Sequence, residues 1–85
     1  MKKRILICDD DPDILEISRR ILERKQYHVD VSTDCESVLP KIKDLDPHVI
    51  LMDLWIPVMG GEAAVGVLKK NDDTKDIPVI LFSAN

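Results

Sequence analysis

Three short aliphatic runs place the strongest constraint on how this chain can fold. Residues 4–8 (RILIC), 49–52 (VILM) and 79–82 (VILF) are four or five residues long and almost entirely apolar. A continuous apolar run of this length is typical of a β-strand that is covered on both faces. We therefore expect strands at these places, and another at residues 28–32 (HVDVS), where apolar and polar residues alternate.

The segment after the first strand has the pattern of an amphipathic helix. Asp11 followed by Pro12 is typical of a helix start, with Asp11 as the N-cap. The helix is expected to end near Lys25. Its apolar residues recur at helical spacing and charged pairs four residues apart lie on its outer surface. The apolar set is Ile14, Ile17, Ile21 and Leu22, and the pairs are Glu16 with Arg20 and Arg19 with Glu23.

Two further helices are expected between the remaining strands. Thr33 or Asp34 can cap the second, which contains Pro40. Because proline removes a backbone hydrogen bond and crowds the preceding turn, we predict that this helix is kinked, shortened or delayed. The third is expected at residues 62–70, after a loop in which Pro57 and the Gly60–Gly61 pair are turn signals. The inward residues of the second are Val38, Leu39, Ile42 and Leu45.

Buried strands that alternate with helices predict an α/β fold. Right-handed crossovers then give a doubly wound parallel sheet with helices on both faces. The length of 85 residues allows one domain, residues 1–85. In such folds the working site lies at the carboxyl ends of the strands. The polar residues expected there are Asp9, Asp10, Asp53 and Ser83.

The overall charge limits the classes of partner. The formal net charge is −4, and the only dense basic run is residues 1–4. Because phosphate binding needs clustered Lys and Arg, direct nucleic-acid binding is not expected. The apolar runs are too short for a membrane span and no signal peptide is evident, which favours a cytoplasmic protein. Cys8 and Cys35 are expected to be free thiols.

Three carboxylates from two strand ends favour a cation. Asp9, Asp10 and Asp53 would form an oxygen-rich pocket that suits Mg²⁺, which takes few carboxylates and keeps several waters. A carboxylate in such a site can also act as a nucleophile toward a phosphoryl group. The Ser83 hydroxyl could donate a hydrogen bond to an oxygen of that group.

Three motifs in series resemble the receiver domain of the response regulators of bacterial two-component systems. They are ILICDDDPDI, VILMDLWIPVMGG with its Asp-x-x-x-Pro-x-Met-x-Gly spacing, and IPVILFSAN. The resemblance implies a flavodoxin-like, CheY-like fold and a sensor histidine kinase that donates a phosphoryl group to Asp53. It also implies a phosphorylation switch that takes part in its own phosphotransfer and slow dephosphorylation, but is not an enzyme in its own right.

The resemblance also assigns roles to individual residues. Asp10 and Asp53 would be direct Mg²⁺ ligands, Asp9 a mainly water-mediated one, and the backbone carbonyl of Trp55 the third protein ligand. Ser83 would be the hydroxyl that turns toward the phosphoryl group. Trp55 and Asn85 would flank the path of attacking water, so that the bulky indole of Trp55 is expected to slow the loss of phosphate.

The chain departs from the family in one respect. A full receiver continues through a fourth helix, a fifth strand with a site lysine and a fifth helix, whereas this sequence ends at Asn85. We therefore expect an incomplete receiver, truncated after the fourth strand with strand order 2-1-3-4. Residues 79–82 would be an exposed edge that invites a homodimer by edge pairing or domain exchange. The alternative function is a phosphorylation-independent interaction module.

Overall fold

A parallel sheet with helices on both faces forms the framework of the protein. The computed structural model describes residues 2–56 and 60–83. In this part of the chain four strands pair in the order β2-β1-β3-β4, all parallel. This confirms the predicted fold class and strand order. The strands are β1 (Arg4–Cys8), β2 (His28–Ser32), β3 (Val49–Asp53) and β4 (Val79–Phe82).

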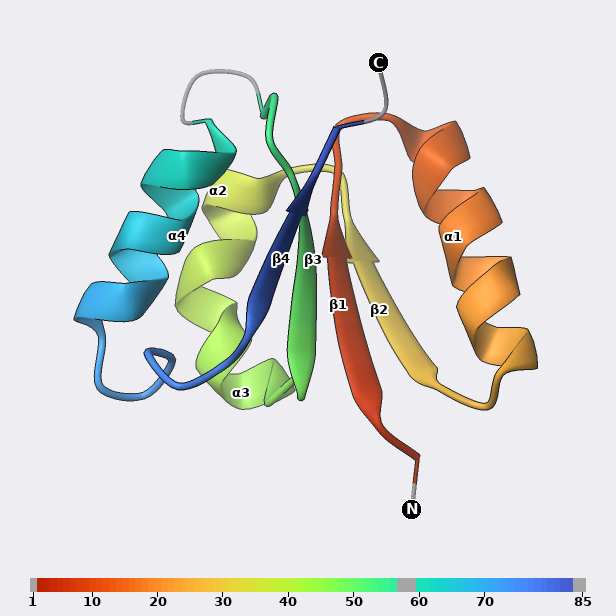
Figure 1. The fold of residues 1–85 in the computed structure, drawn as a ribbon, viewed down its shortest axis with the longest axis horizontal. Helices are drawn as coiled ribbons and strands as arrows, with labels where there is room; N and C mark the ends of the chain where they lie inside the picture. The colour runs from red at the N-terminus through yellow and green to blue at the C-terminus, as the bar shows by residue number, and fades with distance from the viewer. Residues whose placement is uncertain (1, 57–59, 84–85) are drawn as a thin grey trace.

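The helices are divided unequally between the two faces of the sheet (Figure 1). Helix α1 (Pro12–Arg24) covers one face, where it packs over β2 and β1. The other face is covered by α2 (Cys35–Val38), α3 (Ile42–Leu45) and α4 (Gly61–Lys70). No helix of the described part spans enough apolar sequence to cross a bilayer.

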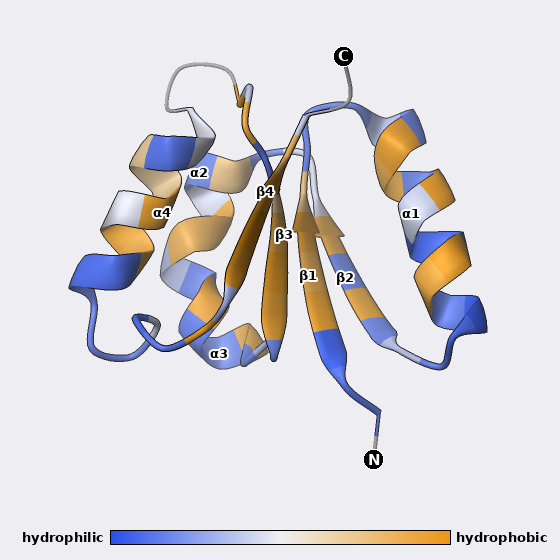
Figure 2. Ribbon diagram, in the orientation of Figure 1, coloured by the Kyte–Doolittle hydropathy of each residue, from blue (hydrophilic) through white to orange (hydrophobic). Residues whose placement is uncertain are grey.

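Strand side chains alternate between two apolar clusters, one on each face of the sheet. Because successive strand residues point to opposite faces, Leu6 and Cys8 join the cluster under α2, α3 and α4, while Ile5 and Ile7 join the cluster under α1. Figure 2 shows the apolar strands at the centre of the molecule and alternating apolar and polar stretches along the helices. The cluster under α1 is the smaller one, and its buried members are Ile5, Ile7 and Leu15.

Helix α1 begins as predicted, but its buried side matches the expected stripe only in part: Leu22 packs in the cluster under α1. Asp11 is the N-cap, and its side chain accepts a hydrogen bond from the backbone N–H of Asp13. The buried residue is Leu15, whereas Ile17 and Ile21 are 57% and 54% exposed. Helical spacing alone could not decide this, because α1 packs mainly against β2 and β1, and Ile17 and Ile21 lie on the side of the helix that faces away from these strands.

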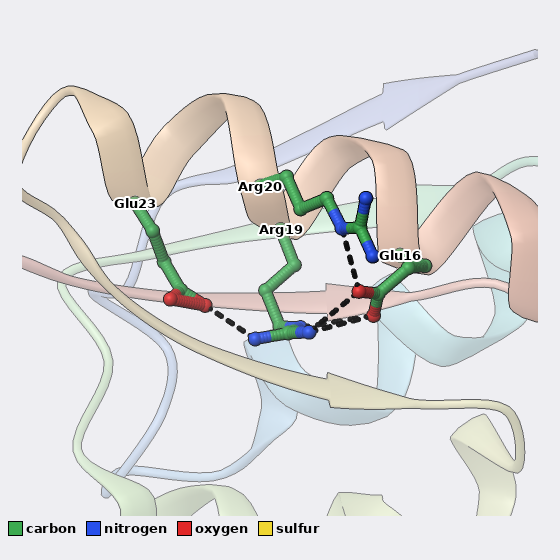
Figure 3. Close-up of polar contacts among 4 residues, drawn as sticks. All are labelled: Glu16, Arg19, Arg20 and Glu23. Carbon is green, nitrogen blue, oxygen red and sulfur yellow. Dashed lines mark hydrogen bonds and ion pairs between the residues drawn. The ribbon is translucent and has the colours of Figure 1, made fainter.

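The outer surface of α1 carries an ion-pair network (Figure 3). Arg19 bridges Glu16 and Glu23, each at 2.7 Å, and Arg20 contacts Glu16 at 2.9 Å. The two predicted pairs are therefore confirmed, and a pair three residues apart is added to them. Hydrogen bonds from Arg19 and then Arg20 lower the pKa of the Glu16 carboxyl. These pairs are exposed, so they support the helix locally and leave the sheet face of α1 to the apolar residues.

Pro40 divides the second predicted helix, as expected. Helix α2 is followed by a 3₁₀ turn, η1 (Leu39–Lys41), and then by α3. Of the two possible caps, Asp34 takes the role, since its side chain accepts from the backbone N–H of Ser37 at 3.1 Å. The interruption lets the segment follow the twisted sheet while its buried residues, Cys35, Val38 and Ile42, stay in one cluster.

Strand β4 is an exposed edge, and part of one sheet face beside it is uncovered. In the parallel register Leu51 pairs with Ile80, so both point to the α1 side of the sheet. Ile80 is 53% exposed, since α1 packs mainly over β2 and β1, on the other side of β3. This confirms the prediction that residues 79–82 form an exposed edge of the sheet in the described part of the chain.

Candidate functional site

The register of the two central strands brings the predicted carboxylates together. Strand β1 pairs with β3 so that Cys8 lies opposite Met52, and the next residues are Asp9 and Asp53. Asp10 follows Asp9 at the same carboxyl end of the strands. One oxygen from each of the three carboxylates lies within 4.8 Å of the others. The carboxylates also lie at the topological switch point of the sheet. From the two central strands, the chain continues outward to β2 next to β1 and outward to β4 next to β3.

Backbone hydrogen bonds orient the two buried carboxylates in the same way. The N–H of Asp11 donates to Asp9 Oδ1 at 2.9 Å, and the N–H of Trp55 donates to Asp53 Oδ1 at 3.1 Å. In each case the donor stands two residues after the acceptor, in the turn that leaves the strand. The carboxylates are thus held by the chain itself. Asp11 turns to the helix and does not join the cluster, as the sequence predicted.

Asp9 is the most deeply buried carboxylate of the cluster. Its side chain is 2% exposed, and within the described residues its Oδ2 atom is buried without a hydrogen-bond partner. Burial raises the pKa of Asp9, and the Asp53 and Asp10 carboxylates raise it further, against the opposing hydrogen bond from Asp11. A buried carboxylate oxygen without a partner is unfavourable unless a positive charge or a proton offsets it.

The donor set fits a small, hard divalent cation. All three groups are carboxylates, two of them buried, and Asp9 Oδ2 is a polar atom without a partner in the described structure. Carboxylate oxygen is the ligand type that Mg²⁺ prefers, and its charge would offset the mutual repulsion of the cluster. The residues present therefore suit the ion that the sequence predicted.

Ser83 and Trp55 lie at the same carboxyl end of the sheet as the carboxylates, and they contact each other. Ser83 directly follows Phe82, which pairs with Asp53 across β3 and β4. The indole Nε1–H of Trp55 donates to Ser83 Oγ at 3.0 Å. Sequence reasoning placed both residues near the site but missed this bond, because no pattern in the sequence shows how an exposed indole is oriented. The predicted roles of the Trp55 carbonyl and of Ser83 stay predictions.

Two glycines after β3 allow the chain to turn tightly under the site. Gly60 has a φ of +80°, a conformation that favours glycine. A Cβ atom on Gly61 would lie 2.5 Å from the carbonyl oxygen of Asp53 and 2.9 Å from Leu54 Cα. The sequence marked this pair only as a turn signal.

Some residues named in the sequence predictions lie outside the described residues. They are the loop residues Pro57 and Met59, the modulating residue Asn85, and Met1 of the basic run.

The two cysteines lie in the same buried cluster, which sequence spacing did not reveal. Cys8 ends β1 and Cys35 begins α2, and both are free thiols, as predicted. A hydrogen bond with Cys8, together with burial, raises the pKa of the Cys35 thiol. His28 and His48 lie at strand starts, at the opposite end of the sheet from the carboxylates, and both are exposed.

Known proteins share both the sequence and the fold. A family model described as response regulator receiver domain matches residues 5–85. The chain is 39% identical over 80 residues to response regulator RR06 of Streptococcus pneumoniae, covering 94% of this chain and 36% of that protein. It is 30% identical over 84 residues to the phosphate regulon transcriptional regulatory protein PhoB of Klebsiella pneumoniae, covering 99% of this chain and 37% of that protein.

Solved structures agree with these sequence comparisons. The N-terminal domain of a response regulator receiver protein from Methanoculleus marisnigri superposes with a TM-score of 0.90 at 29% identity, over 96% of this chain and 67% of that one. A sensor protein from Polaromonas gives a TM-score of 0.92 at 28% identity, over 100% and 68%. The chain thus spans about a third of the length of the curated relatives it matches and about two thirds of these solved chains.

Proposed function

Because the chain belongs to the response regulator receiver domain family of two-component systems, we propose that Asp53 accepts a phosphoryl group from a sensor histidine kinase. The domain then acts as a phosphorylation switch. The observation that supports this most directly is the three-carboxylate cluster with the buried, unpartnered Oδ2 of Asp9. A pocket of this kind suits a cation and a phosphoryl group together, because the carboxylates attract the cation and the cation offsets the negative charge that would otherwise repel the phosphoryl group.

Each residue of the proposed site has its own role in phosphoryl transfer. A carboxylate oxygen of Asp53 forms a bond to phosphorus while the bond from phosphorus to the kinase's histidine nitrogen breaks, and the electron pair leaves on that nitrogen. The N–H of Trp55 fixes the Asp53 side chain for this attack through Oδ1. Asp10, Asp53 and the Trp55 carbonyl would hold Mg²⁺ directly and Asp9 through water. When bound, Mg²⁺ would supply positive charge next to the oxygens of the transferred group.

The proposed partner is a kinase and not a nucleic acid. Among the relatives, MtrA of Mycolicibacterium smegmatis is described as a DNA-binding response regulator, and this chain covers 36% of it. We propose that this domain itself does not bind DNA directly, since its formal net charge is −4. A cytoplasmic location is part of the same proposal.

Phosphorylation can be tested on the purified chain. We expect incubation with Mg²⁺ and a small-molecule phosphodonor to add one phosphoryl group, detected by intact mass and assigned to Asp53 by peptide mapping. Asp53→Ala should lose the modification entirely, since it removes the nucleophilic oxygen. Asp44→Ala is the matched control, because Asp44 is an exposed aspartate of α3 at a distance from the cluster; it should be modified like the unsubstituted chain.

Two results would count against the switch. One is modification that persists in Asp53→Ala, which would place the phosphoryl group elsewhere. The other is a chain that stays unmodified and does not bind beryllofluoride, a phosphoryl mimic, even in a longer version that carries the site lysine of the family. That second result would favour an interaction module.

A second candidate function, self-association, is favoured by the exposed edge. Among residues 2–56 and 60–83, strand β4 has one neighbour in the sheet, and Ile80 and Leu81 are 53% and 38% exposed there. An exposed apolar edge with free backbone groups pairs readily with another copy of the same strand. We propose that two chains associate through β4, by edge pairing or by domain exchange.

Sedimentation at several concentrations tests this association. We expect the apparent mass to rise with concentration and Ile80→Lys to shift the chain toward monomer, since a lysine at an exposed strand position opposes edge pairing. Val67→Lys is the matched control, because Val67 is 48% exposed on α4, away from the edge. A monodisperse monomer that melts cooperatively at all concentrations would contradict the proposal.

A further inference from the structure

One residue, Trp55, is hydrogen-bonded to both of the groups that the proposed switch uses. Its backbone N–H donates to Asp53 Oδ1 at 3.1 Å, and its indole Nε1–H donates to Ser83 Oγ at 3.0 Å. The second bond joins the turn after β3 to the end of β4, across 28 residues of sequence. Trp55 therefore links the phosphoacceptor carboxylate to the hydroxyl through its own two N–H groups.

The indole is not held in place by burial. Trp55 is 61% exposed, and Ser83 is also exposed, whereas Asp9 and Asp53 are 2% and 6% exposed. An apolar ring gains little from the hydrophobic effect when most of its surface stays in water. The hydrogen bond to Ser83 is thus the specific contact that fixes the direction of the ring, and the ring in turn fixes the direction of the hydroxyl.

The direction of the Ser83 hydroxyl decides whether it can serve the site. A serine hydroxyl carries one donor hydrogen and two acceptor positions. In the structure its oxygen accepts from the exposed indole, and among the described residues it makes no hydrogen bond to the buried carboxylates. This bond leaves the hydroxyl hydrogen free but keeps Ser83 Oγ beside the exposed ring, so we expect the side chain to turn toward Asp53 when it donates to a phosphoryl oxygen there.

We propose that Trp55 is a positioning residue that acts through Ser83. Its indole holds the hydroxyl in the outward orientation while Asp53 is unmodified, and this hydrogen bond breaks when the hydroxyl turns to a phosphoryl group. This inference rests on the proposed function of Asp53. It differs from steric shielding of the phosphoryl group, because it depends on the indole N–H and not on the size of the ring.

The hydrogen bond itself can be observed before any ligand is added. Trp55 is the single tryptophan of the chain, so a ¹⁵N-labelled sample gives one indole N–H resonance. We expect Ser83→Ala to move that resonance upfield and Ser83→Thr to leave it near its original position, since threonine keeps the acceptor oxygen. Addition of Mg²⁺ and beryllofluoride to the unsubstituted chain should move the resonance toward the Ser83→Ala position.

The effect of the indole N–H on ligand binding is measured as the affinity of the chain for beryllofluoride in the presence of Mg²⁺. Trp55→Phe keeps an aromatic ring but loses the N–H donor, and we expect it to bind about two- to tenfold more tightly, the range for release of one hydrogen bond. In a Ser83→Ala background the same replacement should have no effect, because the hydroxyl it would release is absent. Both side chains are exposed, so these variants are expected to fold normally.

The outcomes separate this inference from the proposed function. Equal affinities for the unsubstituted chain and Trp55→Phe, or an indole resonance that does not respond to Ser83→Ala, would overturn the role of Trp55 and leave Asp53 as the phosphoacceptor. An equal gain in the presence and absence of Ser83 would assign the effect to the ring alone and also overturn it. Failure of the unsubstituted chain to bind beryllofluoride at all would overturn the proposed function, and this inference with it.

Discussion

Gly61→Ala is expected to lower the free energy of unfolding by about 2 to 3 kcal/mol, the upper part of the range for overpacking. The added Cβ would lie 2.5 Å from the Asp53 carbonyl oxygen, 2.9 Å from Leu54 Cα and 3.0 Å from Leu81 Cδ2. Two of these atoms belong to the backbone, which cannot move aside as a side chain can. The turn after β3 has to shift, and urea denaturation followed by circular dichroism measures the cost.

Gly66→Ala is the matched control and should act in the opposite direction. Gly66 lies within α4, where an added Cβ meets nothing within 4 Å. Alanine is therefore expected to raise the free energy of unfolding by about 0.5 to 1 kcal/mol through its higher helix propensity. Since the shifted atoms in Gly61→Ala adjoin Asp53, that variant alone should also bind beryllofluoride more weakly. Equal stabilities of the two variants would show that the close approach at Gly61 is relieved without cost.

Asp9→Asn is expected to stabilise the chain at neutral pH without divalent cations, by about 1 kcal/mol, because it removes one charge from three clustered carboxylates and its amide N–H can donate to the Asp53 or Asp10 carboxylate where Oδ2 has no partner. Asparagine keeps an oxygen that accepts from the N–H of Asp11 and removes the charge that Asp53 and Asp10 repel. Asp11→Asn is the matched control. Asp11 is exposed and caps α1, and asparagine caps a helix about as well as aspartate does, so little change is expected.

The pH dependence of stability follows from the direction of the Asp9 shift. Its pKa is raised in the folded state from an ordinary value of 3.8, so the folded chain binds more protons than the unfolded chain above that value. The contribution of Asp9 to stability is therefore most favourable below pH 3.8 and is lost as the pH rises through the folded pKa. Asp9→Asn should remove this slope, which denaturation curves across the acidic range measure.

Mg²⁺ should reduce the stability advantage of Asp9→Asn over the unsubstituted chain. A ligand that binds only the folded state stabilises it in proportion to the logarithm of its concentration. We expect Mg²⁺ to stabilise the unsubstituted chain and to stabilise Asp9→Asn much less, so that the advantage of the variant shrinks as the cation is added. If Asp9→Asn is less stable than the unsubstituted chain without cations, burial and charge repulsion at Asp9 do not destabilise the folded chain.

The sequence was sufficient for the parts of the fold that depend on local pattern. The apolar runs predicted β1, β3 and β4, and the polar residue after each run predicted the edge at which the carboxylates meet. Asp11–Pro12 and Pro40 each marked a helix boundary or break through backbone chemistry that acts within one turn. Cluster formation by Asp9, Asp10 and Asp53 followed because parallel strand ends lie at one edge of a sheet.

The features that the sequence did not predict depend on contacts between distant segments. Ile17 and Ile21 fit a buried helical stripe, yet which side of α1 is buried depends on the strands that it reaches. The proximity of Cys8 and Cys35 depends on where α2 packs on β1. The bond from Trp55 to Ser83 depends on the orientation of one exposed ring, which neither periodicity nor spacing determines.

The strand order gives the two halves of the site different local stabilities. The carboxylates follow β1 and β3, the central strands, which each pair on both sides, whereas Ser83 follows β4, which pairs on one side only. Segments with fewer packed neighbours open more often without global unfolding. Fraying of β4 would carry Ser83 away from the carboxylate cluster, while Asp9, Asp10 and Asp53 keep their arrangement. Amide hydrogen exchange should therefore be faster in β4 than in β1 and β3, so that the carboxylate cluster stays formed while the hydrogen bond between Trp55 and Ser83 opens.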